Sequence, residues 1–173
     1  MNLKTKIILA AVGFHFTIPM FAQEQWEPVK GRLMTRWAKK VDPVGVHPEY
    51  PRPQMVRKGW VNLNGLWQYA IAPRDAPRPG ADGQILVPFP VESALSGVGK
   101  TVGAENLLWY RRTFALPRNW SLQRVLLHFG AVDWEAVVWV NGRKVGRHTG
   151  GYDPFTFDVT DALKANAREQ EIV

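Results

Sequence analysis

The residues best suited to chemistry lie in two loops of the C-terminal half of the chain. One loop contains Asp133 and Trp134, and the other surrounds a pair of adjacent glycines with His148, Tyr152 and Asp153. Small-molecule sites combine apolar or aromatic walls with a few polar groups, and sugars suit such a mixture because aromatic rings stack on their C–H faces. Loops are also where a rigid scaffold presents binding residues. These five residues are therefore candidate carbohydrate-binding residues.

The same stretch also has a plainer interpretation. Carboxylates such as Asp133 and Asp153 often cap turns, and Trp134 is large enough to serve as packing. Glu135 and Asp158 are expected to face outward or to lie at strand ends. Binding and packing therefore stay open as alternatives. The other large aromatic residues are expected in the core or at a domain interface: Trp109, Trp139, Phe155 and Phe157.

A further motif, ALSGVGKT at residues 94–101, fits a relaxed phosphate-loop pattern in which Ala replaces the first glycine. Phosphate binding by such a loop requires a buried parallel strand before it and a helix after it. The preceding PFPVE cannot occupy a central sheet position, because proline lacks a backbone donor. The following VGAENLLWYRR is typical of loop and strand. This context argues against nucleotide binding.

Nucleophilic and metal chemistry have little support. The chain contains no cysteine, which excludes disulfides and a thiol nucleophile, and its three serines lack the G-x-S-x-G setting. The histidines outside the first 22 residues, His47, His128 and His148, lack the spacing of a zinc site. We expect His128 to be packed and hydrogen-bonded. No metal and no cofactor is predicted.

Alternating apolar residues predict several β-strands between residues 107 and 160, each with one buried face. Asn141-Gly142 lies between VVWV and RKVG and supplies the positive φ angles of a tight type I′ hairpin. An antiparallel sandwich is the simplest architecture that buries so many one-sided strands. The inward-facing sets are Leu108, Tyr110, Phe114 and Leu116; Val125, Leu127 and Phe129; Trp134, Ala136, Val138 and Val140; and Phe155, Phe157 and Val159.

Two upstream strands are also predicted, LWQYAI with an aromatic face and QILV before a proline pair. The long, glycine-punctuated loop at 92–106 and the loop at 146–154 are expected to reach toward a ligand. Arg112 shares the parity of Tyr110 and Phe114, so a buried Arg112 should pair with a carboxylate or with carbonyls.

The first 22 residues resemble a secretory leader, because Lys4 and Lys6 precede the apolar run IILAAVGF and the segment ends near Pro19 and the small residue Ala22. The run is too short to span a bilayer, and a buried or anchoring N-terminal helix is the alternative. The chain carries a formal charge of +7. Removing the two leader lysines lowers it to +5, a weak argument for a polyanionic partner, and no nucleic-acid binding is predicted. The product is expected in the periplasm or outside the cell.

A string of motifs in this order resembles the amino-terminal sugar-binding domain of glycoside hydrolase family 2, the β-galactosidase and β-glucuronidase group. The motifs are LNGLWQYAI, VPFPVESALSG, LLWYRRTF, LPRNW and RVLLHFGAVDWEAVVWVNGRKVGRHTGGYDPFTFDVTDAL, within about residues 59–173. The resemblance implies a jelly-roll sandwich of the galactose-binding type. It also implies a parent enzyme that hydrolyses β-glycosides with retention, using glutamates in a downstream barrel, so no catalytic residue is assigned to this chain.

We therefore expect a leader at 1–22, an extended proline-rich lead-in at 23–57, and a sugar-binding domain at 58–173. The run EQEIV begins a further strand at the end of the sequence, so the domain is expected to lack its final strand or strands and to be inactive alone. Its expected partners are a carbohydrate and the downstream domains of the parent enzyme. The alternative is a stand-alone carbohydrate-binding or adhesion module.

Overall fold

The computed structural model describes residues 26–49, 57–120, 122–165, 167 and 169–173. The predicted leader at 1–22 lies outside the described residues. Every regular element that is described is a strand or a short 3₁₀ turn. The strands are β1 (Gly65–Pro73), β2 (Gly83–Val87), β3 (Asn106–Ala115), β4 (Leu126–Phe129), β5 (Glu135–Val140), β6 (Arg143–Thr149), β7 (Phe155–Asp158) and β8 (Glu169–Ile172), and the turns are η1 (Arg36–Lys40), η2 (Ala94–Ser96), η3 (Arg118–Trp120) and η4 (Thr160–Ala162).

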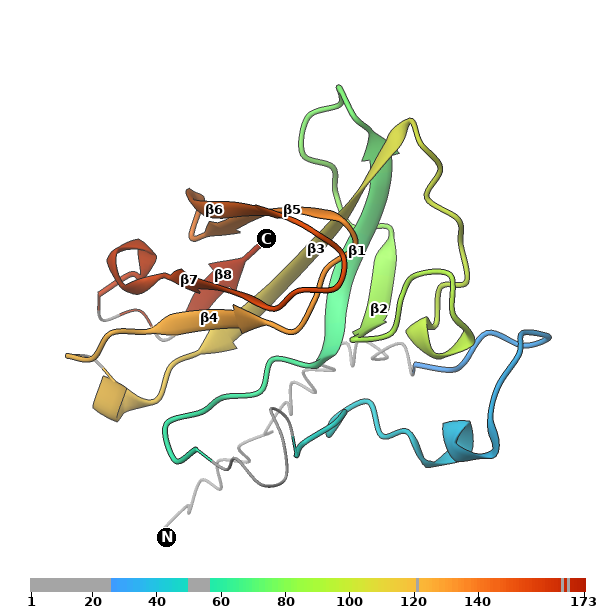
Figure 1. Ribbon diagram of the computed structural model, residues 1–173, viewed down its shortest axis with the longest axis horizontal. Coiled ribbons are helices and arrows are strands. Elements are labelled where there is room, and N and C mark those ends of the chain that lie inside the picture. Colours follow the sequence, from blue (N-terminus) through green and yellow to red (C-terminus); the bar gives the residue numbers. More distant parts are fainter. Residues whose placement is uncertain (1–25, 50–56, 121, 166, 168) are drawn as a thin grey trace, which may run out of the picture.

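The strands form two antiparallel sheets. Six strands make one sheet in the order β2-β1-β3-β8-β5-β6, and β4 pairs with β7 in the second sheet. Figure 1 shows the β4–β7 pair lying alongside the half of the larger sheet that contains β8, β5 and β6. The predicted all-β jelly-roll sandwich is confirmed as this two-layered antiparallel architecture.

The core contains many of the side chains that the period-two patterns predicted to face inward, although not Trp134. Trp67 and Tyr69 of β1, Ile85 of β2 and Val138 of β5 are buried together. The smaller sheet adds Leu127, Phe129 and Phe157, and the segment between β2 and β3 adds Val91, Val98 and Val102. The glycine-punctuated loop that was expected to reach toward a ligand therefore covers the core over β1 and β2, because its valines are better buried than exposed.

The Asn141-Gly142 hairpin is confirmed. Asn141 and Gly142 have φ angles of 51° and 81°, as a type I′ turn requires, and they join β5 to β6. Further along β6, Gly146 lies against the ring of Phe157, and a Cβ atom there would overlap that ring. Glycine at this position therefore allows the two sheets to approach closely.

The run EQEIV forms β8, which lies between β3 and β5. Four of its residues pair with β3, from Glu169 opposite Ala115 to Ile172 opposite Arg112. On the other side, Ile172 pairs with Val140. Ile172 is 1% exposed, so this short strand occupies the centre of the larger sheet.

The described part of the lead-in is fastened to the loop between β2 and β3. The Trp26 indole donates to the Leu95 carbonyl at 3.2 Å, and the Val29 amide donates to the Ala94 carbonyl at 2.9 Å. The Arg32 guanidinium donates to the Gly99 carbonyl at 2.6 Å. The lead-in is thus held by hydrogen bonds to backbone carbonyls of the β2–β3 loop and not by strand pairing.

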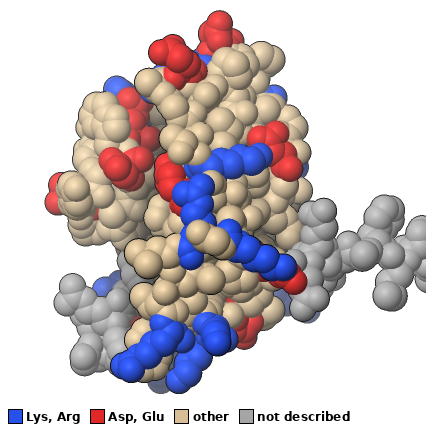
Figure 2. Space-filling model, turned by 90° about the vertical axis from the view of Figure 1, so that its right-hand side faces the viewer, with Lys and Arg blue, Asp and Glu red and all other residues tan. Residues whose placement is uncertain are grey.

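Beyond these contacts the lead-in is exposed and basic. Trp37 is 56% exposed, with the guanidinium of Arg36 and the ammonium of Lys40 4.7 and 5.0 Å from its ring centre. Figure 2, which faces the β2 side of the molecule, shows Lys and Arg side chains gathered at the lower end of that face. Among the described residues, no helix has the length and hydropathy needed to cross a membrane.

Candidate functional site

The two candidate loops leave the same end of the larger sheet. β8 runs antiparallel to both β3 and β5, so those two strands share one direction. β6 is antiparallel to β5, with Thr149 opposite Glu135. Residues 130–134 therefore enter β5 beside the point where residues 150–154 leave β6, and the topology brings the loops together.

Backbone and side-chain contacts join the loops directly. The Gly150 amide donates to the Trp134 carbonyl at 2.7 Å. A Cβ atom placed on Gly151 would lie 2.8 Å from Asp133 Oδ1, so only glycine leaves room for this carboxylate. Gly150 has a φ of 127°, a conformation that residues with a side chain rarely adopt. The diglycine is required by this close approach.

The loop aromatic residues are presented to solvent. Trp134 is 63% exposed and Tyr152 is 96% exposed, although large aromatic residues usually bury most of their surface. Trp134 was predicted to continue the inward-facing set of β5. That prediction is wrong, because the strand begins at Glu135 and Trp134 belongs to the loop. The packing interpretation of Trp134 is therefore the weaker of the two alternatives.

The side chains of His148 and Asp153 both lie close to Gly150, the first glycine of the pair. A Cβ atom on Gly150 would lie 3.5 Å from His148 Nε2 and 3.6 Å from Asp153 Oδ2. The His148 ring stacks on Phe155 with centroids 4.2 Å apart and planes at 15°. Its Nε2 atom is buried and has no hydrogen-bond partner among the described residues. The two loops that contain the five predicted residues thus meet at the diglycine, with side-chain atoms of Asp133, His148 and Asp153 nearest to it.

The neighbouring acids lie at strand ends, as expected, and both have hydrogen-bond partners. Glu135 accepts a hydrogen bond from Arg147 Nε at 2.9 Å, which lowers the pKa of the carboxyl group. At the far end of the sandwich, Asp158 accepts hydrogen bonds from the Thr160 hydroxyl and from Arg124. These bonds lower the Asp158 pKa to about 2. Neither acid belongs to the loop cluster, which is formed by residues 130–134 and 150–154.

The loop at 94–101 does not present its amides to a ligand. The loop and strand pattern that follows it in the sequence argued against phosphate binding, and the hydrogen bonds within the loop support that argument. The Ser96 hydroxyl accepts hydrogen bonds from the amides of Val98 and Gly99 at 3.0 and 3.3 Å. The same hydroxyl lies 2.8 Å from the Ser93 carbonyl. A phosphate loop needs free amides aimed at the anion, and these two are already used.

Arg112 and His128 behave as predicted. Arg112 Nη1 donates to the carbonyls of Leu63 and Asn64 at 2.7 and 2.9 Å, and burial lowers the pKa of its guanidinium. His128 hydrogen-bonds to Thr156 Oγ1 at 2.7 Å and stacks on the Trp60 ring. In the part of the chain that the structure describes, no group of three or more His, Cys, Asp or Glu side chains is arranged to hold a metal ion.

The sequence matches the family model described as glycosyl hydrolases family 2, sugar binding domain, over residues 84–173. This match covers half of the chain, including both candidate loops. The chain belongs to glycoside hydrolase family 2. The resemblance inferred from the motifs is confirmed, and the matched part of this family 2 chain is its sugar-binding domain.

Related family 2 proteins are much longer than this chain. It is 31% identical over 118 residues to a β-glucuronidase from Paenibacillus borealis, covering 64% of this chain and 20% of that protein. It is 33% identical over 134 residues to the β-glucuronidase of Canis lupus familiaris, covering 67% of this chain and 20% of that protein. The chain thus spans about a fifth of the length of these relatives.

Solved structures show the same relationship. The β-glucuronidase of Lactobacillus rhamnosus superimposes with a TM-score of 0.52 at 28% identity, over 64% of this chain and 20% of that one. The fold of the matched 64% of this chain is therefore shared with part of that β-glucuronidase.

One group of polar residues in this family 2 domain was not predicted as a site. Arg78 in the β1–β2 loop, Arg111 of β3 and Glu171 of β8 are brought together on the outer face of the larger sheet. Strand alternation places Arg111 on the face opposite Tyr110. The order of the strands, which puts β8 beside β3, and the path of the β1–β2 loop could not be read from local patterns.

Proposed function

We propose that this chain is the carbohydrate-binding amino-terminal domain of a longer, exported family 2 glycosidase that hydrolyses β-glycosides. Both relatives compared above are β-glucuronidases and extend well beyond the aligned region. Hydrolysis with retention requires two carboxyl groups about 5 to 5.5 Å apart on either side of the bond. The acids of the loop region lie beside glycines or pair with arginine, so we assign the chemistry to other parts of the parent protein.

The loop cluster, residues 130–134 and 150–154, is the proposed sugar-binding surface. The observation that carries this proposal is that two loops, joined by the hydrogen bond from Gly150 to Trp134, expose the rings of Trp134 and Tyr152 and also contain the carboxylates of Asp133 and Asp153. The rings supply faces for stacking, and the carboxylates supply acceptors for hydroxyl groups. The hydrogen bond between Gly150 and Trp134 holds the two halves in a fixed relation, which reduces the entropy lost on binding.

Binding of the purified chain to a glycan array tests this proposal. We expect the wild-type chain to bind β-linked glycans and the double variant Trp134→Ala/Tyr152→Ala to lose at least about tenfold in affinity. Aromatic residues that stack on nucleic-acid bases contribute about 1–3 kcal/mol each, and two rings that stack on a sugar need only a fraction of that for a tenfold effect. Trp37→Ala is the matched control, because Trp37 is similarly exposed but lies in the lead-in. Equal loss in both variants, or none in the double variant, would contradict the proposed surface.

The proposed export and the assignment of catalysis to other parts of the parent protein have separate tests. Expression of the chain in a bacterium should give periplasmic or secreted material that begins near Gln23, and retention of residues 1–22 would contradict the leader. The isolated chain should not cleave aryl β-glycosides. Measurable turnover would show that the chemistry had been assigned to the wrong part of the protein.

A further inference from the structure

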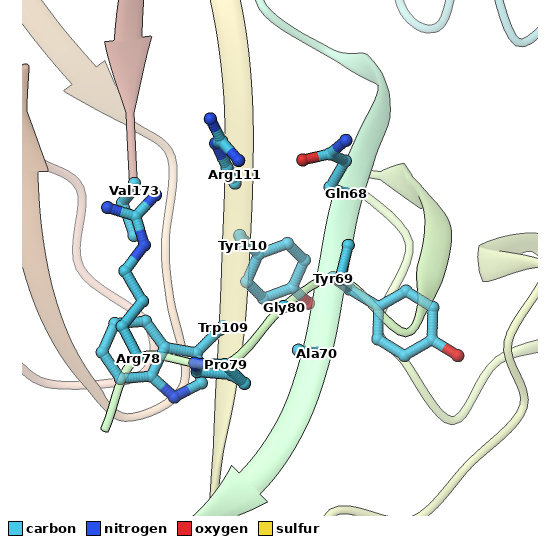
Figure 3. A pocket seen from close by; sticks show the side chains of 11 residues that line it. Gln68, Tyr69, Ala70, Arg78, Pro79, Gly80, Trp109, Tyr110, Arg111 and Val173 are labelled. Carbon is cyan, nitrogen blue, oxygen red and sulfur yellow. The ribbon is translucent and has the colours of Figure 1, made fainter. Parts of the chain in front are cut away.

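A shallow pocket lies on the outer face of the larger sheet, away from the loop cluster. Its floor is formed by β1 and β3, where Gln68 pairs with Arg111 and Ala70 pairs with Trp109. Residues 78–81 of the β1–β2 loop form one wall. Figure 3 shows Gln68 and Arg111 side by side on adjacent strands and Trp109 toward the other end of the pocket, with the Arg78 side chain extending from beside Trp109 toward Val173.

The charged lining contains more positive than negative groups. Arg78 Nη2 lies 3.1 Å from Glu171 Oε1, and Arg111 Nε donates to Glu171 Oε2 at 2.7 Å. Burial raises the pKa of Glu171 and the hydrogen bonds from both arginines lower it, with a net shift downward, so this carboxylate is charged at neutral pH. One carboxylate thus faces two guanidinium groups. Each guanidinium has five N–H donors, and among the described residues Glu171 contacts Nη2 of Arg78 and both Nε and Nη2 of Arg111, which leaves Nη1 of each side chain for a ligand.

The pocket also has an aromatic side and unused polar groups. Trp109 stacks on Trp139 with centroids 5.9 Å apart, and its Nε1 atom is buried without a hydrogen-bond partner among the described residues. Buried polar atoms are rarely left unpaired. The Gln68 side chain is exposed and lies beside Arg111. A ligand with acceptor oxygens could accept from the exposed Gln68 amide, whereas Trp109 Nε1 is buried beneath the surface, and a ligand with an apolar ring face would lie against Trp109.

We propose that this outer pocket binds a pyranose unit that carries an anionic group, with Arg78 and Arg111 holding the anion and Trp109 and Gln68 contacting the ring. This proposal rests on the proposed function as a carbohydrate-binding domain, but it concerns a second site with different residues. Charge-assisted hydrogen bonds from guanidinium groups are about twice as strong as neutral ones. The anion therefore determines which sugars bind.

Titration of the purified chain with D-glucuronic acid, followed by protein NMR, tests the pocket. We expect binding that weakens with added salt, and at least tenfold weaker binding of D-glucose. Arg78→Ala and Arg111→Ala should each weaken glucuronate binding at least tenfold. Arg147→Ala should leave it unchanged. Arg147 is the matched control because its side chain is 57% exposed against 51% for Arg111, and it also pairs with a glutamate on a strand of the same sheet.

The outcomes separate this proposal from the loop surface. If Arg78→Ala and Arg111→Ala bind glucuronate like the wild type, or if sodium sulfate binds at the same residues as tightly as glucuronate, the acidic-sugar site is wrong. The Trp134→Ala/Tyr152→Ala variant should keep glucuronate binding. Loss of array binding in that variant together with unchanged binding in the arginine variants would support the loops and overturn the pocket, and the reverse pattern would support the pocket and overturn the loops.

Discussion

Two glycine-rich loops of this domain look alike in sequence and behave oppositely in the structure. The loop at 94–101 is closed on itself: Ser96 is fully buried, its hydroxyl binds two loop amides, and the lead-in covers it through Trp26. The loop at 150–154 uses one amide to hold residue 134 and leaves the Tyr152 ring in solvent.

The difference lies in what the glycines allow. In the first loop, a Cβ atom on Gly97 would lie 2.9 Å from Trp26 Cδ1, so glycine admits a packing side chain. In the second loop, Gly151 admits the carboxylate of Asp133. Gly97 thus leaves room for an aromatic side chain to pack, and Gly151 leaves room for a carboxylate at the surface. We infer that the first loop stabilises the domain and that the second binds ligand.

Replacing Ser96 should have the largest effect on stability. In Ser96→Ala the amides of Val98 and Gly99 lose their shared acceptor, and an unsatisfied buried amide costs 1–3 kcal/mol, so we expect a loss of about 3 kcal/mol in the free energy of unfolding. Urea denaturation measures it. Ser93→Ala is the control, because its hydroxyl accepts from Ser96 alone, and it should cost about 1 kcal/mol. A near-neutral Ser96→Ala would show that water replaces the hydroxyl.

A smaller loss is expected when Gly97 becomes alanine. Gly97 has a φ of 79° and a near contact with Trp26, whereas Gly142 has a φ of 81° and no atom within 4 Å of a Cβ position. Both substitutions carry the backbone cost of about 1–2 kcal/mol. Gly97→Ala should cost more than Gly142→Ala, and the difference in urea midpoints isolates the contact with the lead-in. Equal costs would mean that Trp26 moves freely.

The loop aromatic residues should contribute little to stability. Trp134→Ala and Tyr152→Ala alter exposed side chains, and surface substitutions usually change the free energy of unfolding by less than about 0.5 kcal/mol. Thermal unfolding should therefore give nearly the wild-type midpoint for both variants, in contrast to Ser96→Ala. A loss of more than about 2 kcal/mol in either variant would assign that residue to packing instead.

Lowering the pH should have the smallest effect on the free energy of unfolding. The group responsible is Asp158, at the end of the sandwich away from both loops. The Asp158 pKa falls from 3.8 to about 2 because the Thr160 hydroxyl and Arg124 stabilise the carboxylate. A lowered folded-state pKa contributes stability that is present above pH 3.8 and is lost as the pH falls toward 2. The urea midpoint of the wild type should therefore fall more between pH 5 and 2.5 than that of Asp158→Asn. Parallel decreases would exclude a contribution from Asp158.

Local patterns predicted much of the fold because each strand has one apolar face. The inward positions of Val138 and Val140 follow from alternation, and the hairpin at Asn141 follows from turn chemistry. The break before Glu135 could not be predicted, since Trp134 continues the alternation although the chain has already left the strand. Apolar periodicity describes a face, and it does not show where pairing begins.

The sites were predicted to different degrees for the same reason. The five loop residues could be proposed because each lies beside a predicted strand, in one of two short stretches, 133–134 and 148–153. The covering role of residues 94–101 was missed, because it depends on a lead-in more than sixty residues earlier. The outer pocket requires Arg78 and Glu171 to meet from 93 residues apart, which only the strand order determines.

Hydrogen exchange with and without a bound glycan is the most direct test of the contrast between the loops. The glycan would be one that the array identifies, added in excess to the purified chain. We predict slower amide exchange in peptides covering residues 130–134 and 150–154, and no change in the peptide covering 94–101. Protection of 94–101 without protection of the other two segments would contradict the assignment of binding to the loop cluster.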